Sequence, residues 1–143
     1  MRAVVWFRIT AVVLLVFATM HTVGFLTFRP PSAEGLAVWH AMNQVRFAVK
    51  GSTFTYGHFY LAFGLSITAA QVFAVWLAWT LGAMAKRGTR GVQAIAWAMF
   101  AWQAVGIVLA AILIAAVPAI FSAIAAFTTG MAAWSSRATE GVA

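Results

Sequence analysis

The sequence predicts an all-α polytopic membrane protein, a bundle of four transmembrane helices with an amphipathic outer helix between spans 1 and 2. Three observations predict it. The chain of 143 residues is 64% hydrophobic and only 8% charged, whereas soluble domains average about 25% charged residues. Its mean hydropathy is +0.96. Its apolar runs match the roughly 20 helical residues that cross a bilayer core of about 30 Å. We expect one domain over residues 1–143.

The first predicted span, residues 9–28, lies between Arg8 and Arg29 and contains no residue of fixed charge. Pro30 and Pro31 end it, because proline cannot donate to the helical hydrogen-bond ladder. A basic flank followed by an apolar run also occurs in signal peptides. This run is longer than a typical signal-peptide core, and no small-x-small cleavage site follows it. We therefore expect an uncleaved span.

Basic residues and a proline delimit the other spans. Lys86 and Arg87 follow the second apolar run. Pro118 separates the third apolar run from the fourth. Proline suits the first turn of a helix, so Pro118 is compatible with the start of the fourth. The final residues, 135–143, read as a short solvated tail. The remaining predicted spans are residues 57–84, 92–117 and 119–134.

The segment of residues 29–56 is the one sizeable connection, and we expect it on the outer side. Ser32 can cap a helix, Glu34 would lie in its first turn, and Gly51 can end it. Apolar residues such as Trp39 fall on one side of this helix. It is therefore expected to lie on the membrane surface or over the mouth of the bundle, unless it is a plain connector.

The distribution of basic residues predicts the orientation. With the N-terminus inside, six Lys or Arg residues fall on the cytoplasmic side and three on the outer side, so the positive-inside rule favours cytoplasmic termini. We expect a multi-pass protein of the bacterial cytoplasmic (inner) membrane. The same placement argues that the net charge of +7 serves topology and contacts with membrane lipids rather than nucleic acid.

Polar side chains within the spans predict a binding site. His21 is expected roughly 10 Å below the outer end of its helix, where an ionisable group in lipid suggests function. The second span carries a small, polar stripe with helical spacing. A largely apolar cavity with a few polar groups suits a lipophilic small molecule, whereas the alternative is hydrogen bonding between helices. The predicted lining residues are His21, Tyr60, Thr68, Gln71 and Gln103, with His58 near the mouth.

Other functions find less support in the residues. The chain has no cysteine and no aspartate, so thiolate chemistry and a Ser-His-Asp triad are excluded. We predict no metal site, and no catalytic residue is identified. Haem held between His21 and His58 is the one cofactor alternative. A small transporter is a further alternative.

The fourth span suggests a different class of function. Ser122, Ala126 and Gly130 form a small-xxx-small face, which allows close helix approach. That face would contact a neighbouring helix of the bundle or a second copy in a homo-oligomer. An accessory or scaffold subunit of a membrane complex is therefore the main functional alternative.

Two segments resemble known proteins. HTVGF, which begins at His21, and FYLAFGLS, which begins at Phe59, resemble uncharacterised small four-span membrane proteins of bacteria over most of residues 1–85. That resemblance implies a topology and no activity. In architecture alone, the chain is similar to the EXPERA group, which includes sterol isomerases and a sterol-binding receptor. Because the acidic pair of that group is missing here, the similarity implies binding of a lipophile more than isomerase catalysis.

Overall fold

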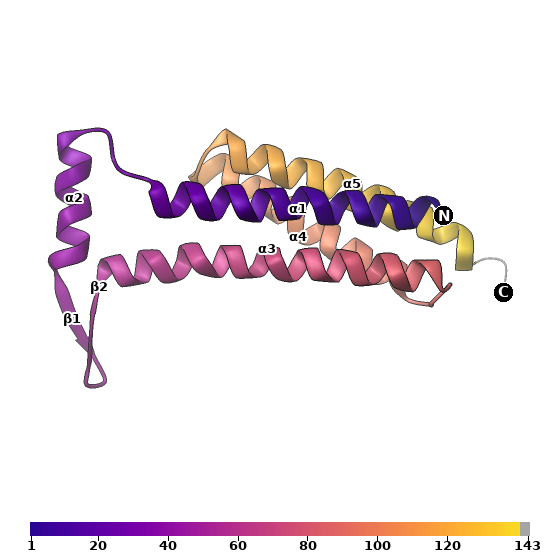
Figure 1. Ribbon diagram of the computed structural model, residues 1–143, viewed down its shortest axis with the longest axis horizontal. Helices are drawn as coiled ribbons and strands as arrows, with labels where there is room; N and C mark the ends of the chain where they lie inside the picture. The colour runs from indigo at the N-terminus through magenta and orange to yellow at the C-terminus, as the bar shows by residue number, and fades with distance from the viewer. Residues whose placement is uncertain (141–143) are drawn as a thin grey trace. The chain divides into compact units, whose positions relative to one another are not determined.

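The computed structural model describes the backbone of residues 1–140 and the side chains of residues 1–136. Four of its helices are long and apolar enough to cross a membrane, as the sequence predicts. The regular structure of the described residues is helical apart from one short hairpin, and Figure 1 shows the order of the elements. They are α1 (Arg2–Thr27), α2 (Ala33–Gln44), β1 (Arg46–Val49), β2 (Ser52–Thr55), α3 (Tyr56–Lys86), α4 (Val92–Leu113) and α5 (Ala116–Glu140).

The chain divides into two compact units. One comprises residues 1–18 together with the chain from residue 71 onward, and the other comprises residues 19–70. We call them the bundle unit and the loop unit. The division falls within α1 and within α3, so each unit contains part of these two helices.

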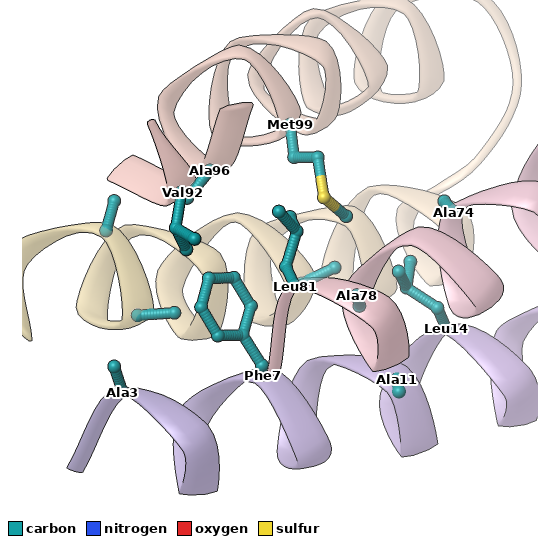
Figure 2. Packing of buried hydrophobic residues seen from close by; sticks show 13 residues of the cluster. Ala3, Phe7, Ala11, Leu14, Ala74, Ala78, Leu81, Val92, Ala96 and Met99 are labelled. Atoms are coloured by element: carbon teal, nitrogen blue, oxygen red, sulfur yellow. The ribbon is translucent and has the colours of Figure 1, made fainter. Parts of the chain in front are cut away.

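The core of the bundle unit consists of small and large apolar side chains from four helices. On α1 the buried residues recur every three or four positions, which places them on one face. In Figure 2 the ring of Phe7 points from α1 toward Val92 of α4, and Met99 reaches from α4 toward Leu81 of α3. Apart from Leu14, alanines fill the other positions, so the helices approach closely. The core residues are Ala3, Phe7, Ala11, Leu14, Ala74, Ala78, Leu81, Val92, Ala96, Met99, Ala125, Ala132 and Ala133.

Small residues also bring α5 close to its neighbours in the bundle unit. A Cβ atom on Gly106 of α4 would lie 3.3 Å from the Ser122 hydroxyl, and one on Gly130 would lie 3.3 Å from the Phe100 ring. Ala126 between them is buried. The face formed by Ser122, Ala126 and Gly130 is therefore used within the chain, which is the first of the two contacts that its spacing predicts. Association of copies stays a prediction.

The ends of the last two helices differ from those predicted. α4 ends at Leu113 rather than at residue 117, and α5 begins at Ala116 rather than at residue 119. Pro118 lies in the first turn of α5, where its missing N–H costs nothing. α5 continues to Glu140, so the prediction that the last helix ends at residue 134 is wrong. The rest of the predicted tail, residues 141–143, lies outside the described part.

The connection between α1 and α3 contains a helix and a hairpin. Ser32 caps α2 as predicted, because its hydroxyl accepts a hydrogen bond from the Gly35 amide at 3.0 Å. The prediction that this helix reaches Gly51 is wrong, since α2 ends at Gln44 and β1 pairs antiparallel with β2. Lys50 and Gly51 form the turn with φ angles of 47° and 84°, the positive values that a tight hairpin requires.

Aromatic contacts hold the hairpin against the start of α3. Phe47 of β1 pairs with Phe54 of β2. The Phe47 ring lies 4.9 Å from that of Tyr56 and 5.4 Å from that of Phe59, measured between ring centroids. A two-stranded hairpin is marginal by itself, so this aromatic cluster stabilises it.

Within the loop unit, α1 contacts α3 at a glycine. A Cβ atom on Gly64 would collide with the Phe25 ring of α1. That ring is itself confined, because the His21 ring stacks at 5.8 Å and the Tyr60 ring lies at 4.9 Å. The glycine therefore permits an approach that a larger residue would prevent.

We expect Gly64→Ala to lower the free energy of unfolding by roughly 1–3 kcal/mol, because the added methyl group overpacks a confined ring. Unfolding in detergent, followed by circular dichroism, measures this change. Gly24→Ala is the matched control, since nothing lies within 4 Å of its added Cβ atom. It should be neutral or slightly stabilising. Equal stability of the two variants would contradict the close contact at Gly64.

Candidate functional site

His21 is engaged in a contact between α1 and α3. Its Nε2 atom lies 3.2 Å from the carbonyl oxygen of Gly64. The imidazole ring is also nearly parallel to the ring of Phe25, with an angle of 12° between their planes. A ring nitrogen next to a carbonyl oxygen acts as a hydrogen-bond donor. The sequence predicts that the imidazole ring of His21 contacts a ligand. In the structure the same ring contacts both α1 and α3.

Thr68 also connects α1 with α3. Its hydroxyl lies 2.9 Å from the Thr22 hydroxyl. Together with Gly64 and Tyr60, it forms the small, polar stripe that the spacing on α3 predicts, and within the loop unit this stripe faces α1. Hydrogen bonds of this kind contribute about 0.6 kcal/mol on average to the stability of membrane proteins. The contact between Thr22 and Thr68 therefore adds little stability, and its main effect is to orient α1 and α3 relative to each other within the loop unit.

A pocket of about 180 Å³ lies in the loop unit. In Figure 1, α2 runs crosswise to the adjoining ends of α1 and α3, and all three helices contribute to the lining. The rings of Phe25 and Tyr60 lie 4.9 Å apart, and the Trp39 ring meets Tyr60 edge-on at 5.7 Å. The lining residues are Phe25, Leu26, Trp39, Met42, Asn43, Gly57, His58, Tyr60 and Leu61.

Asn43 supplies an amide group to this pocket. Its Nδ2 atom donates a hydrogen bond of 2.8 Å to the carbonyl oxygen of Trp39. A Cβ atom on Gly57 would collide with the Asn43 amide. The glycine at the start of α3 therefore allows the side chain of Asn43 to lie close to the backbone of α3.

His58 caps the N-terminus of α3 through a reciprocal pair of hydrogen bonds. The backbone N–H of His58 donates to the Thr55 hydroxyl at 3.2 Å, and the backbone N–H of Thr55 donates to Nδ1 of His58 at 3.4 Å. This is the geometry of a capping box with imidazole in the position usually held by Glu or Gln. Because Nδ1 accepts, the neutral ring carries its proton on Nε2. His58 is thus a hydrogen-bond donor at Nε2.

The six residues that the sequence groups in one cavity belong to two units of the structure. His58 and Tyr60 line the pocket. His21 and Thr68 belong to the same unit but bond between α1 and α3. Gln71 and Gln103 lie in the bundle unit, where their side chains are 8% and 2% exposed.

The residues with which α1 and α2 line the pocket were not predicted from the sequence. Trp39, Met42 and Asn43 are spaced by three and four positions, so they share one side of α2. Trp39 and Met42 were expected on the apolar side of that helix, but the position of α2 over Phe25 could not be predicted. An amphipathic pattern predicts a buried side without saying what covers it.

Haem held between His21 and His58 would need one ring nitrogen of each residue as an iron ligand. Nε2 of His21 lies against a carbonyl oxygen, and Nδ1 of His58 accepts a backbone hydrogen bond. With Nε2 of His21 as the donor, its Nδ1 carries the lone pair that an iron ligand needs. His58 would have to release the Thr55 amide or change its tautomer, so haem between the two histidines stays a prediction. Among the side chains of residues 1–136, no three His, Asp or Glu groups come together as a metal site.

Comparisons with models of protein families, with curated protein sequences and with solved structures find no match to this chain. The resemblances to bacterial four-span proteins and to the EXPERA group accordingly stay predictions.

Gln71 and Gln103 each bury a polar atom that has no partner. Oε1 of Gln71 and Nε2 of Gln103 are enclosed without a hydrogen bond. A buried polar atom without a partner costs about 1–3 kcal/mol. These two amides thus do not form the hydrogen bonds between helices that are the alternative to a cavity.

We expect Gln103→Met to raise the free energy of unfolding by roughly 1 kcal/mol, because an apolar side chain of similar volume replaces a buried donor without a partner. Gln93→Met, on the same helix but only half-buried, should change stability less. Both are measured by detergent unfolding of the purified protein. Loss of stability in Gln103→Met would show that the amide has a polar partner.

Proposed function

We propose that this chain is an integral membrane protein that binds a lipophilic small molecule, whose head is an uncharged ring with a hydrogen-bond acceptor, in the pocket beneath α2. The observation that carries the proposal is the combination of aromatic walls with His58. The rings of Phe25, Trp39 and Tyr60 line the pocket, and the capping box makes Nε2 of His58 a donor.

The volume of the pocket limits the part of the ligand that it can enclose. An apolar cavity of about 150 Å³ holds one benzene molecule, and this pocket measures about 180 Å³. One substituted ring therefore fits, whereas the fused rings of a sterol do not. An apolar tail would extend from the pocket into the surrounding lipid.

The polar groups of the pocket favour an acceptor on the ligand. His58 offers an N–H group, and Tyr60, which lines the same pocket, offers a phenolic O–H group. None of the lining residues carries a fixed charge. A ligand carbonyl oxygen would satisfy these donors, whereas a purely hydrocarbon ligand would leave them without partners.

A cationic ligand is disfavoured although aromatic walls often bind cations. The guanidinium carbon of Arg29 already lies 5.5 Å from the centroid of the Trp39 ring. A second positive charge in the adjacent pocket would be repelled by Arg29. The environment thus favours a neutral head over a quaternary ammonium group.

The hairpin supports a location of this pocket near a membrane surface. β1 and β2 pair only with each other, so their outer edges leave backbone polar groups for water. Such edges are not tolerated in hydrocarbon. Together with the positive-inside rule, this supports our proposal of a pocket near the outer leaflet of a bacterial inner membrane, with both termini in the cytoplasm.

Binding of three matched probes tests the proposal. The probes are decylbenzoquinone, which has ring carbonyls, decylbenzene, which has none, and decyltrimethylammonium, which is cationic. We expect decylbenzoquinone to raise the thermal unfolding midpoint of the detergent-solubilised protein most, because a ligand that binds only the native state stabilises it. Equal shifts with decylbenzene would contradict the role of a hydrogen-bond acceptor.

Two histidine variants locate the site. His58→Glu retains a capping-box residue at this position but removes the donor, so binding of decylbenzoquinone should weaken about five-fold or more. His40→Glu makes the same change on α2, at an exposed residue that does not line the pocket, and should bind as the unmodified protein does. Retained binding in His58→Glu would contradict the proposed site.

A further inference from the structure

Arg8 makes an unusual contact in the bundle unit. Its guanidinium carbon lies 3.3 Å from the centroid of the Trp79 ring of α3. A guanidinium group stacked on an aromatic face still presents N–H groups at its edge, in a planar fork that matches two oxygen atoms of a phosphate or carboxylate. The contact with Trp79 therefore fixes the group without using its hydrogen bonds.

No described side chain of the bundle unit balances the charge of Arg8. One terminal nitrogen of its guanidinium, Nη1, is buried and makes no hydrogen bond. The chain contains only two acidic residues, Glu34 and Glu140. Glu34 belongs to the loop unit, and the side chain of Glu140 lies outside the described residues. A guanidinium with one nitrogen buried and without a partner favours a nearby anion, and the described side chains of the bundle unit supply none.

A second cation is expected on the same face of α3. A Cβ atom on Gly82 would lie 3.7 Å from Nε of Arg8, so this glycine turns toward Arg8. Lys86 follows Gly82 by four positions and hence shares its side of the helix. Seven residues separate Trp79 from Lys86, roughly 10 Å along the axis.

We propose that Arg8 and Lys86 bind the phosphate of an anionic phospholipid, with the Arg8 guanidinium held on the Trp79 ring. Basic residues and tryptophans favour the headgroup level at the ends of spans, and each basic residue there contributes attraction to anionic lipids. The site depends on insertion of the chain into a bilayer. It shares no residue with the pocket of the loop unit, so either site can fail without the other.

Native mass spectrometry tests this site on the full chain released from bilayers with equal amounts of phosphatidylglycerol and phosphatidylcholine. The unmodified protein should retain phosphatidylglycerol preferentially. Arg8→Gln should lower that preference about five-fold, the effect of one basic residue near the surface. Arg90→Gln is the matched control, because it removes the same charge from an exposed residue of the α3–α4 connection, and it should lower the preference clearly less than Arg8→Gln does.

Two further variants distinguish specific binding at this site from general electrostatic attraction to anionic lipid and from misfolding of the variant. Lys86→Gln alters an exposed residue, so it should fold normally and reduce the preference as Arg8→Gln does. Arg8→Lys retains the charge without the planar fork and should bind less than the unmodified protein. Full retention in Arg8→Lys, or an equal loss in Arg90→Gln, would overturn the proposal. Displacement of the lipid by inorganic phosphate would instead show a site for free anions and would also overturn it.

Discussion

The constraint on which this structure depends is the apolar surface that its long helices leave uncovered. Large side chains such as Phe63, Ile112 and Trp134 are more than 60% exposed. A water-soluble protein rarely leaves contiguous apolar surface of this kind uncovered. If lipid covers these helices, the exposed apolar side chains contact hydrocarbon instead of water. Burial of apolar surface inside the chain then need not drive the association of the helices.

The internal contacts are consistent with that environment. In the bundle unit, alanine and glycine permit close approach of helices, and hydroxyl groups such as Thr10 and Thr128 bond at 2.9 Å. In the loop unit, Gly64 admits the Phe25 ring, and Thr22 bonds to Thr68. Close packing and polar contacts between helices therefore replace the bulky apolar core that stabilises a soluble protein of this length.

The sequence predicts the four long helices because each apolar run carries its own signal of length and hydropathy. It also predicts the cap at Ser32. It does not predict the hairpin, because Val45 and Val49, four positions apart, can be read as one side of a continuing helix. The alternation of Phe47 with Ala48, followed by the turn at Gly51, determines the strands. The candidate site was predicted only in part, since Tyr60 and His58 line the pocket, whereas its α2 wall depends on packing that no periodicity encodes.

Accessibility of single cysteines tests membrane crossing most directly, because the natural chain contains no cysteine. Lys50→Cys on the hairpin and Ala115→Cys between α4 and α5 should react with an impermeant thiol reagent in sealed right-side-out vesicles. Arg90→Cys between α3 and α4 should react only after the vesicles are opened. Reaction of all three from the same side of an intact membrane would contradict a chain that crosses lipid four times.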